Sequence, residues 1–196
     1  MKLLILGSSL ARDLSWYYPE SEYTIGGKTV KICYESFIGK SFEYFVDNPK
    51  KIDKILCSHE PQLILVIFGA NSISTRVPKK KLLENCRDFY QLLKNSVLNH
   101  CPETKIIAHQ VPLRFVYNGF KNTPDPETFK LIRTTLNNKI RKLKTIDYYL
   151  VIGGSDWTKL DHEEYFRDGI HFECFAIEIQ FELIVKKLEF IFSKHD

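Results

Sequence analysis

The sequence lacks the long apolar runs and paired cysteines that mark several large classes of protein. No stretch approaches the roughly 18 consecutive apolar residues that a membrane-spanning helix needs. The apolar part of the N-terminus covers only about five residues, short of the roughly 7–15 of a secretory signal. The 5 cysteines are odd in number, widely spaced and without a Cys-x-x-Cys pair, which argues against a disulfide framework or a zinc ribbon. We therefore expect a cytoplasmic protein with reduced thiols.

Several motifs that bind nucleotides or metals are also missing. The chain has no P-loop and no Gly-x-Gly-x-x-Gly fingerprint, which argues against nucleotide binding. The Gly-x-Ser-x-Gly sequence of many lipases is missing too. The acidic run from Asp161 to Glu164 lacks the His-x-x-x-His spacing of zinc proteases, and we interpret it as a charged loop. We expect no metal and no organic cofactor.

The composition is that of one ordinary globular domain. With 196 residues, 44% hydrophobic and 27% charged, the chain can bury a core without metal or disulfide support, and we expect a single domain over residues 1–196. The net charge of +4 is mildly basic. The densest basic runs, 79–81 and 139–144, fall in helical patterns, so a charged face toward water is their simplest interpretation.

Apolar segments that end in turn residues alternate with helical patterns along the chain. The expected strands are residues 2–6, 28–34, 63–68, 105–109 and 148–152. The expected helices are residues 79–98 and 127–143, whose apolar residues recur near a 3.6-residue period. The segment from Phe175 onward alternates like a strand but also fits a helix, and we predict a helix because it is long and rich in Glu, Lys and Leu.

Strands that alternate with helices predict right-handed crossovers and a mostly parallel sheet. In such sheets the functional residues gather at the carboxyl ends of the strands. The expected positions are Gly7 to Ser9, the segment after Tyr34, Gly69 to Asn71, Gln110 to Arg114, and the segment after Ile152.

Residues near these strand ends suit acyl transfer. Ser9 lies on a tight turn that enters a helix, and a serine hydroxyl becomes nucleophilic when a base takes its proton. His171 is such a base, and Asp168, three residues earlier, can fix its tautomer. The Gly39 N–H and the Asn71 amide are suitable donors for a developing oxyanion.

These residues together resemble the four sequence blocks of the SGNH (GDSL-like) hydrolase superfamily. The blocks occur in the family's order over almost the whole chain, as Gly7-x-Ser9, Gly39, Gly69-x-Asn71 and Asp168-x-x-His171. The resemblance implies a flavodoxin-like, three-layer α/β/α sandwich around about five parallel strands, in agreement with the alternation of strands and helices.

The resemblance also implies a role for each matching residue. Ser9 would be the nucleophile, His171 the base and Asp168 the partner that orients it. The backbone N–H groups of Ser9 and Gly39 and the side chain of Asn71 would form the oxyanion hole.

The blocks depart from the family pattern at two positions. Ser8 stands where the first block usually has Asp, and Ser72 stands where Asp often follows the third-block Asn. Ser8 is a rival nucleophile, although the family register favours Ser9. The Gly39 block is short, so Gly26 and Gly27 are rivals for its donor role.

A substrate pocket is expected around the strand ends. Its candidate lining residues are Arg12, Arg76, Arg114 and Trp157. These residues equally fit a surface role with packed side-chain stems. Loops over residues 116–125 and 157–167 are expected to cover the site and to set its specificity.

The leading hypothesis is a serine esterase that hydrolyses short-chain, acetyl-type esters through an acyl-Ser9 intermediate. The alternative is an SGNH-fold binding or recruitment module, of the kind found in retrotransposon-associated proteins, that contacts nucleic acid or a membrane through its lysine-rich helix faces. A third hypothesis is a flavodoxin-like ligand-binding protein without catalysis. Ser9 taken alone also fits the role of a helix N-cap.

Overall fold

The computed structural model describes residues 1–112, 124–151 and 173–194. The described strands form one 6-stranded sheet in the order β2-β3-β1-β4-β5-β6. Their bounds are β1 Lys2–Gly7, β2 Ser21–Ile25, β3 Lys28–Ser36, β4 Leu63–Ile67, β5 Lys105–His109 and β6 Tyr148–Leu150. The helices are α1 Ser9–Tyr17, α2 Phe42–Asp47, α3 Lys50–His59, α4 Lys79–His100, α5 Pro126–Arg141 and α7 Cys174–Phe192, with a short 3-10 helix η1 at Ala70–Ser72.

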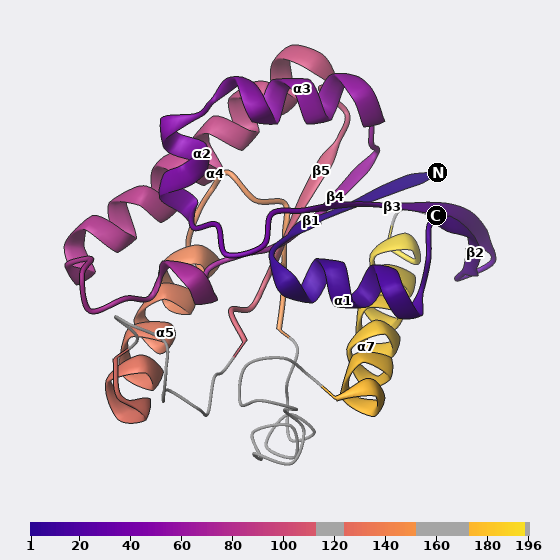
Figure 1. Ribbon diagram of the computed structural model, residues 1–196. Coiled ribbons are helices and arrows are strands. Elements are labelled where there is room, and N and C mark those ends of the chain that lie inside the picture. The colour runs from indigo at the N-terminus through magenta and orange to yellow at the C-terminus, as the bar shows by residue number, and fades with distance from the viewer. Residues whose placement is uncertain (113–123, 152–172, 195–196) are drawn as a thin grey trace.

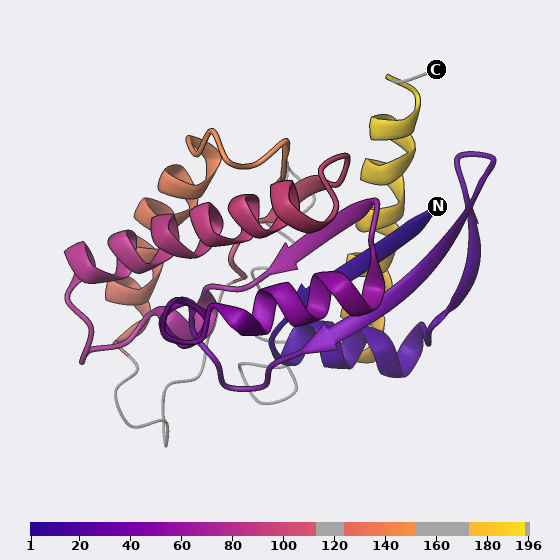
Figure 2. The ribbon, with the colours of Figure 1, turned by 90° about the horizontal axis from the view of Figure 1, so that it is seen from above.

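Helices cover both faces of the sheet, which confirms the expected three-layer α/β/α sandwich. Side chains alternate along each strand, so one face of β1 and β4 packs on α1 and α7 and the other packs on α2, α3, α4 and α5. Figure 1 shows α1 and α7 together, apart from the other four helices, and Figure 2 gives the view of the same molecule from above. The strands β1 and β4 read as continuous apolar runs because both of their faces are buried.

The sheet is parallel except at one edge. β1 pairs in parallel with β3 and β4, and β5 with β4 and β6. The extra strand β2 is antiparallel to β3, and the two are joined by a turn at Gly26 and Gly27. This strand is missing from the sequence prediction because only Ile25 in it is buried, which leaves no apolar pattern. The same turn lies at the amino end of β3, at the opposite edge from Ser9. Gly26 and Gly27 therefore cannot take the donor role predicted for Gly39, and these two alternatives are wrong.

The predicted helices are present with small shifts at their ends. The two central helices are α4 and α5, and the ambiguous C-terminal segment is the helix α7, as predicted. Ile177, Phe181, Ile184 and Leu188 form the buried face of α7. One hollow is lined by the C-terminal end of α7, by Met1 and by the starts of β4 and β5. The end of α7 therefore lies at the amino edge of the sheet, and the helix runs antiparallel to these strands. Its first turn therefore lies toward the carboxyl edge of the sheet.

A group of aromatic rings fixes α2 on the sheet. Phe42 and Phe45 of α2 are fully buried, against Phe89 of α4 and Phe68, the residue after β4. The ring centroids of Phe45 and Phe68 are 5.2 Å apart, and those of Phe42 and Phe89 are also 5.2 Å apart. Such pairs contribute about 0.5–1.5 kcal/mol each beyond the burial of their area. This packing positions the chain directly after Gly39.

The described ranges contain neither a membrane-spanning helix nor a cluster of metal-binding side chains. There, no helix combines the length and the apolar character that a membrane crossing requires. In the same ranges, no group of three or more His, Cys, Asp or Glu side chains is arranged to hold a metal ion.

Candidate functional site

The first predicted block lies at the carboxyl end of β1, where α1 begins. Gly7 ends the strand, and a Cβ atom added there would lie 2.7 Å from the Ala11 Cβ and 3.0 Å from the Ile67 carbonyl oxygen. Only glycine therefore lets the first turn of α1 pack so closely on β1 and β4. The Ser8 N–H donates to the Ile67 carbonyl over 3.3 Å, which fixes the turn.

The structure separates the roles of the two serines at this turn. Ser8 occupies the N-cap position of α1, without a side-chain cap hydrogen bond, and is only 8% exposed. Ser9 is the first residue of the helix and is half-buried. Ser9 is therefore not the N-cap of α1, and it is the more accessible of the two hydroxyls.

The second block follows the neighbouring strand β3. Gly7 pairs with Ser36 across the sheet, and the Phe37 N–H donates to the Gly7 carbonyl over 2.8 Å. The chain then turns, with Lys40 N–H donating to the Phe37 carbonyl over 3.1 Å, and Gly39 in this turn is exposed with a φ of +71°. The Gly39 turn is therefore tied to the end of β1 that carries Ser9.

The third block follows β4 on the other side of β1. Gly69 has a φ of +125°, and a Cβ atom there would approach the Val111 Cγ2 within 2.6 Å. Both observations require glycine at this position. The bend leads into η1, where the half-buried Asn71 donates from Nδ2 to the Lys40 carbonyl over 3.5 Å. This long hydrogen bond joins the third block to the Gly39 turn.

Ser72, the residue after Asn71, has a structural role at the start of α2. Its side chain is 5% exposed, and its Oγ accepts a hydrogen bond from the Phe42 N–H over 3.1 Å. Phe42 is the first residue of α2, whose own N-cap, Ser41, makes no side-chain cap hydrogen bond. Ser72 thus supplies from η1 the acceptor that the start of α2 lacks.

Three of the four predicted blocks therefore meet at the carboxyl edge of the sheet. Hydrogen bonds connect the Ser9 turn to the Gly39 turn, and the Gly39 turn to Asn71. The fourth block, with Asp168 and His171, lies outside the described residues. The predicted pocket residues Arg114 and Trp157 also lie outside them.

The two described arginines of the predicted pocket have different surroundings. Arg12 is on α1 and donates from Nε to Oδ1 of the buried Asp13 over 2.8 Å, while its guanidinium lies 4.5 Å from the centre of the Trp16 ring. Arg76 is exposed and lies four residues beyond η1. Arg12 is therefore held by its own helix, whereas Arg76 is open to a ligand.

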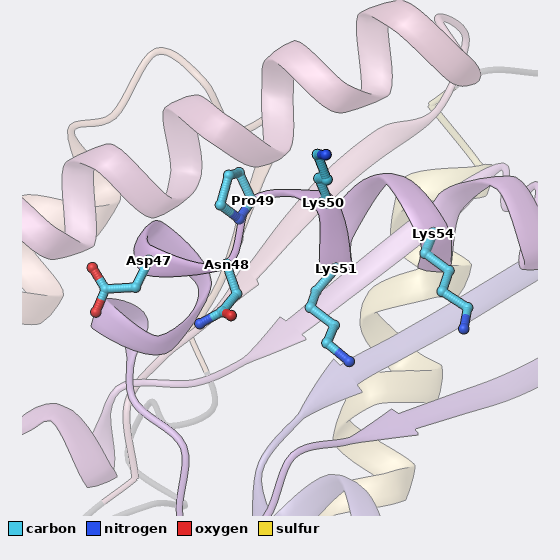
Figure 3. Close-up of a pocket in the computed structure, with 6 residues that line it drawn as sticks. All are labelled: Asp47, Asn48, Pro49, Lys50, Lys51 and Lys54. Atoms are coloured by element: carbon cyan, nitrogen blue, oxygen red, sulfur yellow. The ribbon is translucent and has the colours of Figure 1, made fainter.

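A hollow of about 350 Å³ lies beside Asn71, between α2 and α4. Its lining is mostly polar, with Asn71, Arg76, Glu43, the 4% exposed Asn85 and three serines beside the apolar Phe42, Val77 and Leu82. A further hollow of about 400 Å³ lies at the α2–α3 junction and is lined by Asp47, Asn48, Pro49, Lys50, Lys51 and Lys54 (Figure 3). This second hollow contains no residue of the predicted site.

One buried histidine at the carboxyl edge was not identified from the sequence. His109 ends β5, is 1% exposed, and has its Nδ1 hydrogen-bonded to the Gln110 carbonyl. Burial lowers the pKa of His109 to about 4, although the Gln110 carbonyl and the buried side chain of Gln180 oppose the shift. His109 is therefore neutral at pH 7. Only its position at the end of an apolar strand could have indicated that it is buried.

Comparisons with known proteins establish the fold. No protein-family model matches the sequence, and neither does the sequence of any curated protein. Solved structures do match. An acetyl esterase variant with an acetate ion is 13% identical, with 100% of each chain covered and a TM-score of 0.68. A GDSL-like lipase from Bacteroides thetaiotaomicron is 14% identical, with 96% of this chain and 87% of that chain covered and a TM-score of 0.66.

A carbohydrate esterase of family 3 from Talaromyces cellulolyticus is similar to the same extent. It is 12% identical, with 99% of each chain covered and a TM-score of 0.65. The chain therefore has the fold of the SGNH (GDSL-like) hydrolases over almost its entire length.

Proposed function

We propose that the chain is a serine esterase that hydrolyses short-chain, acetyl-type carboxylic esters through an acyl-Ser9 intermediate. The observation that carries the proposal is the meeting of Ser9, the Gly39 turn and Asn71 at one edge of the sheet. A nucleophile beside two sets of N–H donors is the arrangement that acyl transfer needs. The helix α7 begins toward this edge at Cys174, three residues after His171 in the sequence, which supports the inclusion of His171.

The proposed reaction has two displacement steps. His171 takes the proton of the Ser9 hydroxyl as the Ser9 Oγ attacks the ester carbonyl, and Asp168 stabilises the imidazolium that forms. The N–H groups of Ser9 and Gly39 and the amide of Asn71 donate to the oxyanion. The alcohol leaves with the proton from His171, and water then hydrolyses the acyl-Ser9 ester by the same route.

The hollow beside Asn71 is the proposed place for part of the substrate. Asn71 lines it, so a group bound there adjoins the proposed oxyanion hole. A volume of about 350 Å³ and a partly polar lining suit a small group rather than a long acyl chain. The exposed Arg76 and Glu43 in its wall offer a hydrogen-bond donor and an acceptor to a polar substrate.

The substitution Ser9→Ala tests the proposal directly. We expect the rate of 4-nitrophenyl acetate hydrolysis to fall at least about 10³-fold, because the nucleophile is lost. Ser8→Ala is the matched control, since Ser8 is buried at the adjacent position, and it should retain most of the activity. A serine-directed phosphonate should label the wild-type chain at Ser9. Equal rates for wild type and Ser9→Ala would refute Ser9 as the nucleophile.

A further inference from the structure

The opposite edge of the sheet carries a second group of reactive side chains. The helices α3 and α4 both end at the amino edge, just before β4 and β5 begin. There, Cys57 on α3 meets His100, the last residue of α4, with 3.4 Å between the Cys57 Sγ and the His100 Nδ1. The other ring nitrogen of His100, Nε2, lies 3.3 Å from the Asp53 Oδ1, one turn earlier on α3.

These two contacts favour one position for the proton of the neutral imidazole. The Asp53 carboxylate lies 3.3 Å from the His100 Nε2, and its negative charge favours a proton on that nitrogen. The His100 Nδ1 is then the acceptor and faces the Cys57 thiol. A nucleophile bonded to a base that a third group orients is the arrangement that activates thiols and hydroxyls.

The group is accessible and lies on a basic helix. Cys57 is exposed, and the side chains of His100 and Asp53 are 34% and 42% exposed. Lys54 lies three residues before Cys57, hence on the same side of α3. It also lines the hollow at the α2–α3 junction with Lys50 and Lys51 (Figure 3). The three lysines outnumber the two nearby carboxylates, Asp47 in the hollow and Asp53 on α3, so a small molecule with carboxylates would meet a net positive charge on this side of the helix.

The other cysteines lack this arrangement. Cys33 and Cys86 are buried, and burial raises the pKa of both thiols, that of Cys86 to about 12. Cys174 is exposed, but its Sγ lies 2.7 Å from the hydroxyl oxygen of Tyr17 rather than beside a histidine. Cys101 is half-buried and follows His100 directly. Cys174 and Cys101 thus serve as internal references, because neither thiol is hydrogen-bonded to a histidine ring among the described residues.

We propose that Cys57 is a thiol–disulfide exchange site that takes a low-molecular-weight disulfide carrying carboxylates. The His100 Nδ1 accepts the thiol proton, and the Cys57 thiolate attacks one sulfur of the disulfide. A new bond joins the Cys57 Sγ to that sulfur as the original S–S bond breaks. The leaving thiolate takes the proton from His100, so one protein thiol and one disulfide become one mixed disulfide and one free thiol.

The test uses the full-length Ser9→Ala protein, so that ester hydrolysis has no influence on the result. The reduced protein is treated with oxidised glutathione, and mass spectrometry of peptides follows the adduct at each cysteine with time. We expect the mixed disulfide to form at Cys57 at least about tenfold faster than at Cys101 or Cys174. Equal rates at the three thiols would overturn the proposal.

Two substitutions separate activation by His100 from simple exposure. His100→Gln should slow the reaction at Cys57 about tenfold, because the base is lost. His59→Gln is the matched control at the end of α3, since His59 contacts Glu35 over 2.9 Å and no thiol, and it should leave the rate unchanged. An unchanged rate in His100→Gln, in a protein whose circular dichroism matches that of the parent, would refute the role of His100.

Charge selection is measured with two disulfides of opposite charge. Oxidised glutathione should react faster than the cationic cystamine, and Lys54→Gln should reduce this ratio by about two- to fivefold, because one positive charge beside the thiol is removed. A preference for cystamine in the parent protein would refute the assignment of a carboxylate-bearing disulfide.

Discussion

At the scale of single residues, Gly69 combines two requirements that no other residue type meets. Its φ of +125° suits glycine, and an added Cβ atom would lie 2.6 Å from the Val111 Cγ2. We expect Gly69→Ala to destabilise the fold by more than about 2 kcal/mol, because backbone strain and a clash in the core add together. The free energy of unfolding in urea measures this loss.

Gly27 provides the matched control for this prediction. It also has a positive φ, +75°, but an added Cβ atom there would meet nothing within 4 Å. Gly27→Ala should therefore cost only about 1–2 kcal/mol, from the backbone alone. If the two variants were equally stable, contact with Val111 would not be the reason for glycine at position 69.

His109 gives the fold a dependence on pH. Its pKa in the folded protein is about 4, below the roughly 6.5 of an unfolded histidine, so the unfolded chain binds the proton more readily between these values. The stability that His109 contributes is complete above about pH 6.5 and is lost progressively as the pH falls to about 4. The loss amounts to about 3 kcal/mol.

Urea unfolding at pH 7 and pH 5 checks this expectation. His109→Gln removes the titrating group, so the stability of that variant should fall less between the two pH values than that of the wild type. His100→Gln is a suitable control because the side chain of His100 is 34% exposed. A wild-type protein that is as stable at pH 5 as at pH 7 would contradict the prediction.

At the scale of elements, the start of α2 depends on an acceptor from another segment. The Phe42 N–H bonds to the Ser72 Oγ of η1 over 3.1 Å, whereas Ser41 makes no side-chain cap hydrogen bond. Ser72→Ala should destabilise the fold by about 1–2 kcal/mol, because a buried N–H loses its partner. The same change should lower kcat for ester hydrolysis, because Asn71 adjoins Ser72.

The neighbouring serine gives the comparison that this prediction needs. Ser41→Ala should change the free energy of unfolding by less than about 0.5 kcal/mol, although Ser41 occupies the nominal N-cap position. Unfolding in urea and steady-state hydrolysis of 4-nitrophenyl acetate measure the two effects. If Ser41→Ala lowered the free energy of unfolding more than Ser72→Ala does, the N-terminus of α2 would be capped by Ser41 and not by Ser72.

At the scale of the whole molecule, the parallel topology explains why distant segments meet. Each crossover returns the chain to the same edge, so the turns after β1, β3 and β4 are neighbours although Ser9 and Asn71 are far apart in sequence. The helices end at the opposite edge for the same reason, which brings Cys57 and His100 together. The two edges thus hold the proposed esterase site and the proposed thiol site.

Most of the architecture could be predicted from the sequence. Continuous apolar runs mark β1 and β4 because both of their faces are buried, and the periodic helices α4 and α5 followed from their spacing. β2 could not be predicted because it is short and mostly exposed, and α2 and α3 were not identified. Of the predicted site, Ser9, Gly39 and Asn71 lie at one edge, while the catalytic roles stay predictions.

The sequence by itself determined the five parallel strands, the order of the four blocks and the choice of glycine at tight turns, because these follow from local pattern and backbone sterics. Only the tertiary structure decided which side chains meet. The Ser72 acceptor for α2, the buried state of His109 and the contact of Cys57 with His100 all depend on segments far apart in the chain. Such contacts depend on how the helices pack on the sheet, and the pattern of residues along the sequence does not show that packing.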